Sequence, residues 1–262
     1  MGFGEAAIDF VCSDLVGQLD GAYYGHWNGF ITGGVPTPAT LFSGEGHLGG
    51  AVFWRQQDIG MFGISGSRIF QTDGLTFNGV ATAPDQTTGL WRIGAMGEYY
   101  GSDTFTLGGG IHYINGQNPN LILGQVDLTG VEGDVYAKFY AAENFDLSVR
   151  GDLLSTSYNV VGHPGRMTGY AISANAEYLV PSSALSFFLE ARYASRTWDA
   201  GSFGTATYDD TQGLLGFKYA FGSVAPSSLR DRDRHGSYDN TSVFNEKLPN
   251  FGMDGINFTY TP

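Results

Sequence analysis

The stretch Phe145-Asp146-Leu147-Ser148-Val149-Arg150-Gly151-Asp152-Leu153 decides the fold. Its odd-numbered positions carry apolar side chains or glycine, and its even-numbered positions carry aspartate, serine or arginine. Because a β-strand turns successive side chains to opposite faces, this segment has one apolar face and one charged face. The same alternation runs through 89–100, 129–140, 169–180 and 184–195. We therefore expect an all-β protein built from two-faced strands.

Ten segments have strand character, and each has about the length that a tilted strand needs to cross a bilayer. The segment 47–57 fits the alternation less well than the others, and its register could be shifted by one residue. The loops described below could also hide further pairing, which leaves eight or twelve strands open. The ten expected strands are 16–27, 47–57, 59–68, 89–100, 103–114, 129–140, 143–154, 169–180, 184–195 and 211–221.

The connections between these segments alternate in length. Short turns are expected near residues 56–58, 101–102, 141–143 and 180–183. The long connections are rich in Gly, Pro, Asn, Asp and Thr, the usual turn formers. Short turns at one end and long loops at the other are typical of an up-and-down barrel of the bacterial outer membrane. The expected long loops are 28–46, 69–88, 115–128, 155–168 and 196–210.

Aromatic residues gather at the ends of the expected strands. Amphipathic rings at both ends of an aliphatic band match the two interfacial girdles of a membrane barrel. A soluble β-sandwich or lipocalin-like barrel, the alternative, gives no reason for this placement. One expected rim holds Trp54, Tyr99, Phe105, Phe139, Phe145, Tyr178 and Phe221, and the other holds Trp27, Trp91, Tyr113, Tyr170 and Tyr193.

The polar faces of the expected strands carry charges of both signs. In a transmembrane antiparallel up-and-down β-barrel these charges point into the lumen, where they must pair or stay hydrated. A ten-strand barrel is narrow, so either a salt-bridged filled interior or a small conduit with weak cation preference would result. The expected lumen charges are Asp20, Arg92, Glu98, Glu132, Asp134, Lys138, Asp146, Arg150, Asp152, Glu177, Glu190, Arg192 and Lys218.

Composition narrows the functional classes. The net charge of −13 disfavours nucleic-acid binding, because phosphate recognition needs clustered Lys and Arg. Cys12 is the single cysteine and cannot form an internal disulfide. The sequence contains no run of 18 apolar residues, so it predicts no transmembrane helix. Residues 1–15 lack the basic start and apolar core of a signal peptide, so we expect the numbering of an exported chain to begin after processing.

The sequence does not predict an enzyme, a cofactor or a metal site. His26, His47, His112 and His163 stand in no recognisable catalytic motif. A hydrolase sited at the rim, with His112 as base, is the weakest of the functional hypotheses. Asp231-x-Asp233-x-x-Gly236 faintly resembles a calcium loop, but Ser242 stands where the required Glu belongs.

The last part of the chain, 222–262, differs from the rest. A Ser/Ala/Pro linker leads into Leu229-Arg230-Asp231-Arg232-Asp233-Arg234-His235, which we interpret as a solvated charged linker. An apolar tail is expected to dock on a neighbouring copy, on another envelope protein or back into its own barrel, and strand addition is one available mode. The docking residues are expected to be Phe244, Leu248, Phe251, Ile256, Phe258 and Tyr260.

The segment Gly216-Phe217-Lys218-Tyr219-Ala220-Phe221 resembles the last strand of bacterial outer-membrane barrels, which ends in Gly-x-x-aromatic-x-Phe. It departs from that pattern because a tail follows the final Phe. The resemblance covers about 16–221 and implies the outer membrane of a Gram-negative bacterium, with loops outside and both termini periplasmic. The expected domains are an N-terminal segment (1–15), the barrel (16–221) and the tail (222–262). The expected role is structural or interactive, with a porin-like channel as the alternative.

Overall fold

The computed structural model describes residues 2–12, 14–32, 35–77, 80–120, 124–160, 163–199, 204–219, 227–235 and 259–261. Almost all of them lie in strands, with one short helix, α1 (Leu229–His235). The strands are β1 (Gly2–Cys12), β2 (Leu15–Thr32), β3 (Val35–Gln56), β4 (Gly60–Phe77), β5 (Val80–Ser102), β6 (Phe105–Asn120), β7 (Gly124–Ala142), β8 (Phe145–Val160), β9 (His163–Leu179), β10 (Leu185–Asp199), β11 (Thr205–Tyr219) and β12 (Thr259–Thr261).

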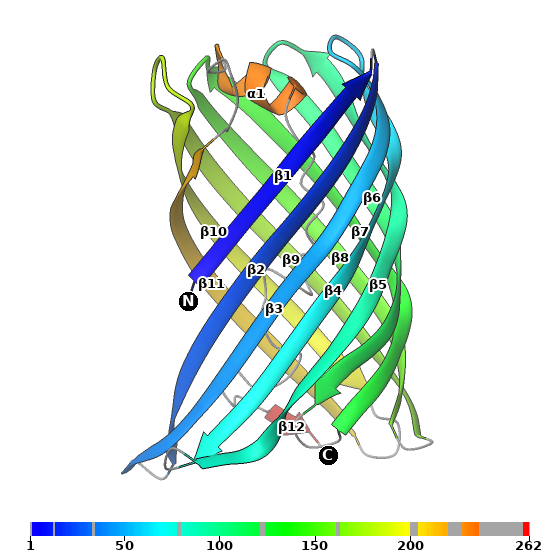
Figure 1. The fold of residues 1–262 in the computed structure, drawn as a ribbon, viewed down its shortest axis with the longest axis vertical. Coiled ribbons are helices and arrows are strands. Elements are labelled where there is room, and N and C mark those ends of the chain that lie inside the picture. Colours follow the sequence, from blue (N-terminus) through cyan, green and yellow to red (C-terminus); the bar gives the residue numbers. More distant parts are fainter. Residues whose placement is uncertain are drawn as a thin grey trace.

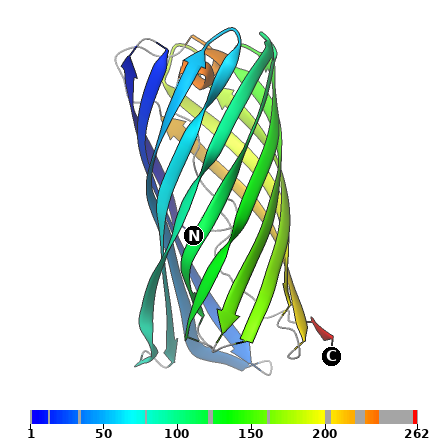
Figure 2. The ribbon, with the colours of Figure 1, turned by 90° about the vertical axis from the view of Figure 1, so that its right-hand side faces the viewer.

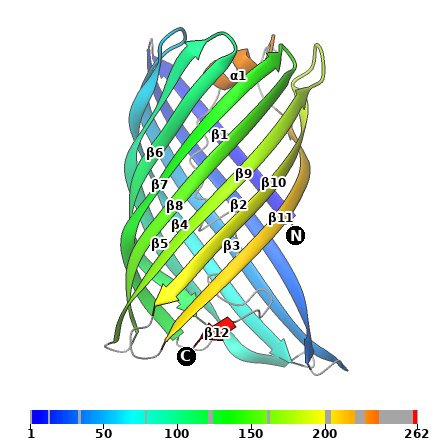
Figure 3. The same ribbon diagram turned by 180° about the vertical axis from the view of Figure 1, so that it is seen from behind.

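The strands form one up-and-down sheet in sequence order, and every described ladder is antiparallel. The sheet curls round into a tall cylindrical wall (Figures 1, 2 and 3). Within the described residues, no ladder joins β1 to β11, so hydrogen bonds do not close the sheet into a barrel. The all-β, antiparallel, up-and-down character expected from the alternation is confirmed.

The ten expected strands correspond to β2–β11, and the structure adds β1 and the short β12. Residues 2–12 lie within the expected N-terminal segment, yet they pair with β2 from Gly2–Gly25 to Cys12–Leu15. The signal was present in the sequence: Glu5 and Asp9 alternate with Ala6, Ile8 and Phe10, as in the neighbouring strands.

The expected long loops are mostly strand. β2 and β3 extend through much of 28–46, β4 and β5 through much of 69–88, and β10 and β11 through much of 196–210. The wall is therefore much taller than a band of about 10 residues per strand. Gly, Pro, Asn and Asp in these segments favour loops, whereas Thr, which is common in turns, is also a good strand former.

The wall has two ends that we name by their connections. The turn end holds the tight turns after β3, β5, β7 and β9, and the opposite end, where the sequence predicts the long loops, is called the loop end. Helix α1 lies at the turn end, while β12 pairs with Thr205–Thr207 at the loop end (Figure 1). The sequence placed both termini on the turn side, so the position of β12 differs from that expectation. A backbone edge left free on β11 gives three tail residues their hydrogen-bond partners there.

The two faces of the sheet are inverted relative to a water-soluble protein. Leu153 is 68% exposed on the outer face, whereas its neighbour Asp152 is 2% exposed. Ile93 and Leu189 are exposed in the same way, next to buried Arg92 and partly buried Glu190. In β3, Leu48 and Val52 lie outside and Phe53 inside, which settles the register that the sequence left open. The outer face is apolar and the inner face carries the charges.

Gly60 stands where the tight turn after β3 enters β4. Its φ is 154°, and a Cβ there would collide with the carbonyl oxygen of Glu98. We expect Gly60→Ala to lower the free energy of unfolding by about 1–3 kcal/mol, because backbone strain and the collision add. Gly151→Ala is the matched control, since no atom lies within 4 Å of the place that its added Cβ would take. Equal urea midpoints for the two variants would contradict this account of Gly60.

Candidate functional site

The residues that the sequence assigned to the lumen lie along the inner face, although their burial differs. Arg92, Glu132, Asp146, Asp152, Glu177 and Arg192 are buried. Lys218 is the exception, since its side chain is 51% exposed while its Nζ still reaches Glu177. The remaining members are partly exposed: Asp20, Glu98, Asp134, Lys138, Arg150 and Glu190.

Helix α1 packs against this inner face at the turn end. The backbone N–H of Leu229 donates to the carbonyl oxygen of Glu143 at 2.8 Å. The Leu229 side chain is fully buried against Tyr140 and Leu179. Ser228 stands before the first turn, and its Oγ accepts a hydrogen bond from the N–H of Asp231 at 3.0 Å, as an N-cap does. One apolar contact and one cap thus fix where the helix begins.

Arg232 joins the helix to Glu177 on β9. Its Nη1 forms an ion pair with Oε1 of Glu177 and donates to Oγ of Ser186 at 2.9 Å. Lys218 approaches the other oxygen of Glu177 at 2.9 Å. Glu177 therefore receives one cation from the helix and another from β11.

Asp233 makes the second charged contact between helix and wall. Nζ of Lys138 donates to Oδ2 of Asp233 at 2.5 Å, and the hydroxyl of Tyr140 donates to the same oxygen at 3.3 Å. Burial alone would raise the pKa of Asp233, but Lys138 and Arg232 hold it well below its usual range. The carboxylate is charged at neutral pH and ties α1 to β7.

Arg234 makes a third set of contacts between the helix and the wall. Its Nη2 donates to the carbonyl oxygens of Ser102 and Phe105, at 2.5 and 3.3 Å, and its guanidinium lies 4.6 Å from the centre of the Tyr100 ring. These contacts reach the turn between β5 and β6. Helix α1 is thus bonded to the β5–β6 turn and to β7, β9 and β10.

A second polar cluster lies further along the inner face. Nη2 of Arg92 donates to Nδ1 of His112 at 2.9 Å, and Nε2 of His112 lies 2.9 Å from Oγ of Ser65. Because Nδ1 accepts from arginine, the neutral ring carries its proton on Nε2 and donates to Ser65. His112 in this arrangement cannot take a proton from Ser65, so the pair does not form the nucleophile and base of a hydrolase.

Beyond this cluster, toward the loop end, the inner face turns apolar. Ile69, Leu90, Ile114 and Met167 are fully buried there, and they belong to one cluster with Leu128, Leu154, Tyr158, Ala171 and Ala194. Trp198 packs against it, with its ring centre 5.0 Å from that of Tyr158. Sequence reasoning missed this layer because it followed charges rather than every inward position. The alternation itself, extended from Arg92 to Leu90 or from His112 to Ile114, would have found it.

Sequence reasoning also misread the charged run at 229–235. The sequence predicts a solvated linker, but Arg232, Asp233 and Arg234 bind α1 to the wall. Alternating charges carry no sign of burial unless the partners on the wall are known. Of the expected tail-docking residues, Tyr260 pairs through its backbone with Ala206, and the others lie outside the described part of the chain: Phe244, Leu248, Phe251, Ile256 and Phe258.

The aromatic residues assigned to two rims lie mostly on the outer face. Trp91, Tyr99, Tyr113, Phe139, Tyr170 and Tyr178 are exposed, and Trp54, Phe105, Phe145 and Tyr193 are partly exposed. The side chain of Trp27 and the whole of Phe221 lie outside the described residues. Because the strands extend beyond the expected band, Trp91 stands midway along β5 rather than at its end.

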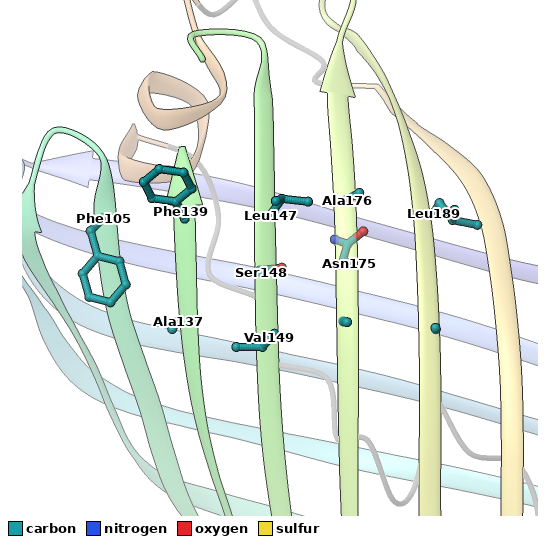
Figure 4. Close-up of a pocket in the computed structure, with 11 residues that line it drawn as sticks. Phe105, Ala137, Phe139, Leu147, Ser148, Val149, Asn175, Ala176 and Leu189 are labelled. Atoms are coloured by element: carbon teal, nitrogen blue, oxygen red, sulfur yellow. The ribbon is translucent and has the colours of Figure 1, made fainter. Parts of the chain in front are cut away.

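A shallow apolar groove of about 530 Å³ crosses the outer face of β6–β10 (Figure 4). Small side chains such as Ala137 and Ala176 form its floor, between larger Phe139, Leu147 and Leu189. Its walls offer almost no polar atoms, so an occupant could be held only by apolar contact.

No protein-family model matches the chain, and no curated protein is detectably similar to it. In the described part of the chain, no helix has both the length and the apolarity required to span a bilayer. The described residues also contain no group of three or more His, Cys, Asp or Glu side chains placed to hold a metal ion.

The docking of α1 should resist mild acid. A carboxyl whose pKa is lowered in the folded state stabilises that state above its ordinary pKa, and this contribution is lost as pH falls further. Asp233 has an ordinary pKa of 3.8. A dye on His235→Cys, in a Cys12→Ser background, should therefore report a docked helix from neutral pH to about pH 4 and a change only in stronger acid.

Asp233→Asn should make the docking of α1 less favourable by about 2 kcal/mol already at neutral pH, because a charge-assisted hydrogen bond from Lys138 is lost. The control is Asp103→Asn, which removes the more exposed pair with Arg230 and should change little. An unchanged dye signal in Asp233→Asn would contradict the assigned role of Asp233.

Proposed function

We propose that this chain is a β-barrel of the outer membrane of a Gram-negative bacterium, with a structural or interaction role. Its apolar outer face would lie in lipid and its charged inner face would line a filled interior. The observation that carries the proposal is the inversion of the two faces. Large apolar residues such as Leu215, Phe217 and Leu153 are 82%, 69% and 68% exposed, while Arg92, Asp146 and Glu177 are buried.

The free energy of removing apolar side chains from water supports the lipid setting. Transfer of one large aliphatic or aromatic side chain out of water is favourable by about 1.5–3 kcal/mol, and exposed apolar residues recur along β2–β11. Soluble monomers rarely expose continuous apolar patches of more than a few hundred Å². In a bilayer the same residues need no partner, and the backbone is satisfied strand to strand except at free edges. The apolar groove of β6–β10 fits the same setting, since hydrocarbon chains need no polar contacts.

The filled inner face supports a structural rather than a transport role. At the turn end the interior holds α1 with its charged contacts, and toward the loop end it holds the apolar cluster around Leu90 and Ile114. Between them, Arg150 binds Asp134 and Asp152, at 3.5 and 2.8 Å. Such pairs offset the cost of removing charges from water and fix the shape of the wall. The residues beyond His235 remain our candidates for contact with a second copy or another envelope component.

A small conduit is the second candidate, favoured by the surplus of acids on the inner face. Asp134 and Asp146 keep carboxylate oxygens without a hydrogen bond, which water or a cation would satisfy. A channel of this kind would prefer cations, because the acids outnumber the bases among the lumen charges.

The lipid setting predicts where a new charge is tolerated. Val149 lies on the outer face of β8, midway between Phe145 and Leu153, and is 54% exposed. We expect Val149→Arg to destabilise the protein folded in lipid vesicles by about 2–4 kcal/mol, because the charge would lie in hydrocarbon. Gln117→Arg, on the exposed outer face beyond Tyr113, is the matched control and should change it little. Equal effects of both variants, or a native protein that stays monodisperse without detergent, would refute the proposal.

Planar-bilayer recordings separate the two roles. A filled interior should give no current above background for the native protein over a range of voltages. Steady unitary currents that reverse at a potential favouring cations would instead establish the conduit, and Asp134→Asn should then reduce that preference.

A further inference from the structure

We propose that α1 can leave the wall reversibly, because the wall holds a replacement partner for each of the two inner-face charges that the helix neutralises, Lys138 and Glu177. Release of α1 would therefore leave neither of these two charges without an opposite charge. The geometry around Lys138 and Glu177 carries this inference, which does not depend on whether the outer face lies in lipid.

The first replacement partner is Asp146 on β8. In the ladder between β7 and β8, Lys138 stands opposite Ser148, and Asp146 stands two residues further on the same face. Such diagonal neighbours lie within reach of a long side chain. Lys138 nevertheless bonds Asp233 of the helix, and the carboxylate of Asp146 is fully buried with no hydrogen bond to either oxygen.

Asp146 is therefore in an unfavourable environment while the helix is docked. A buried carboxylate without a hydrogen-bond donor carries a large desolvation cost, which nearby positive charges must offset. Lys138 attracts it most strongly and Lys218 also attracts it, whereas Asp233 and Glu177 repel it. When α1 leaves, the repulsion from Asp233 disappears and Lys138 becomes free to bond Asp146. The new bond between Lys138 and Asp146 stabilises the undocked state, and the repulsion between Asp233 and Asp146 destabilises the docked state.

The second replacement partner is already in place. Glu177 shares its two oxygens between Arg232 of the helix and Lys218 of β11. Departure of α1 removes Arg232, but the contact with Lys218 at 2.9 Å remains. Both wall charges that α1 neutralises thus keep an opposite charge in the undocked state.

The two acids that face Lys138 should have opposite effects on docking, which a merely structural charge cluster would not produce. The readout is the rate at which a maleimide labels Ser228→Cys in a Cys12→Ser background, because Ser228 is buried when α1 is docked. The substitution weakens the N-cap of α1 equally in every variant, so all rates are compared within this background. Asp233→Asn removes a bond of the docked state and should raise the rate about tenfold or more. Asp146→Asn removes both the repulsion and the replacement partner, and should lower the rate about fivefold.

Lys218→Met provides an independent test, since Glu177 would then depend on Arg232 alone. It should also lower the labelling rate, even if Asp146→Asn fails to fold, and resistance of each variant to heat in gel electrophoresis reports folding. The proposal fails if Asp146→Asn or Lys218→Met labels as fast as the parent or faster. It fails equally if Asp233→Asn labels no faster, because the helix would then be held by other contacts.

Discussion

The structure depends on a single constraint, the alternation of side chains across strands whose two faces meet different surroundings. A slip of one residue would bring Asp152 to the apolar outer face and Leu153 to the charged inner one, so the register is strongly specified. Several of the charged inner residues pair with each other within a strand or across a ladder. Arg150 with Asp134 and Asp152 shows how one guanidinium links adjacent strands.

The tail helix adds a different kind of stability to this wall. Most pairs along the strands come from residues that the ladders already bring together, whereas α1 supplies Arg232 and Asp233 from a separate part of the chain. Contacts of this kind can be made and broken without disturbing the ladders. The strand ladders and the docking of α1 therefore rest on different sets of contacts, although the side chains of both form one network.

The alternation predicted much of this fold because strand direction and side-chain orientation follow from local geometry. It gave the ten strands β2–β11, the apolar outer face and the inward position of residues such as Glu132 and Arg192. The contacts of Asp233 with Lys138 and of Arg234 with Ser102 could not be predicted, since they join residues 95 and 132 positions apart in the chain. The full length of β5 does not follow from the sequence because Pro, Gly and Asn in 69–88 favour loops, and β1 does not follow because residues 1–15 are considered only as a possible signal peptide.

The order of the strands has a consequence for the seam between β1 and β11. Each strand reverses the direction of the one before it, so the first and the eleventh both run toward the tight turns. Joined directly, they would form the wall's one parallel ladder, with its slanted hydrogen bonds. A segment running the other way would instead keep the pattern uniform, and the three residues of β12 already do so along the start of β11. One full-length strand in the position of β12 would therefore allow the sheet to close with antiparallel pairing throughout.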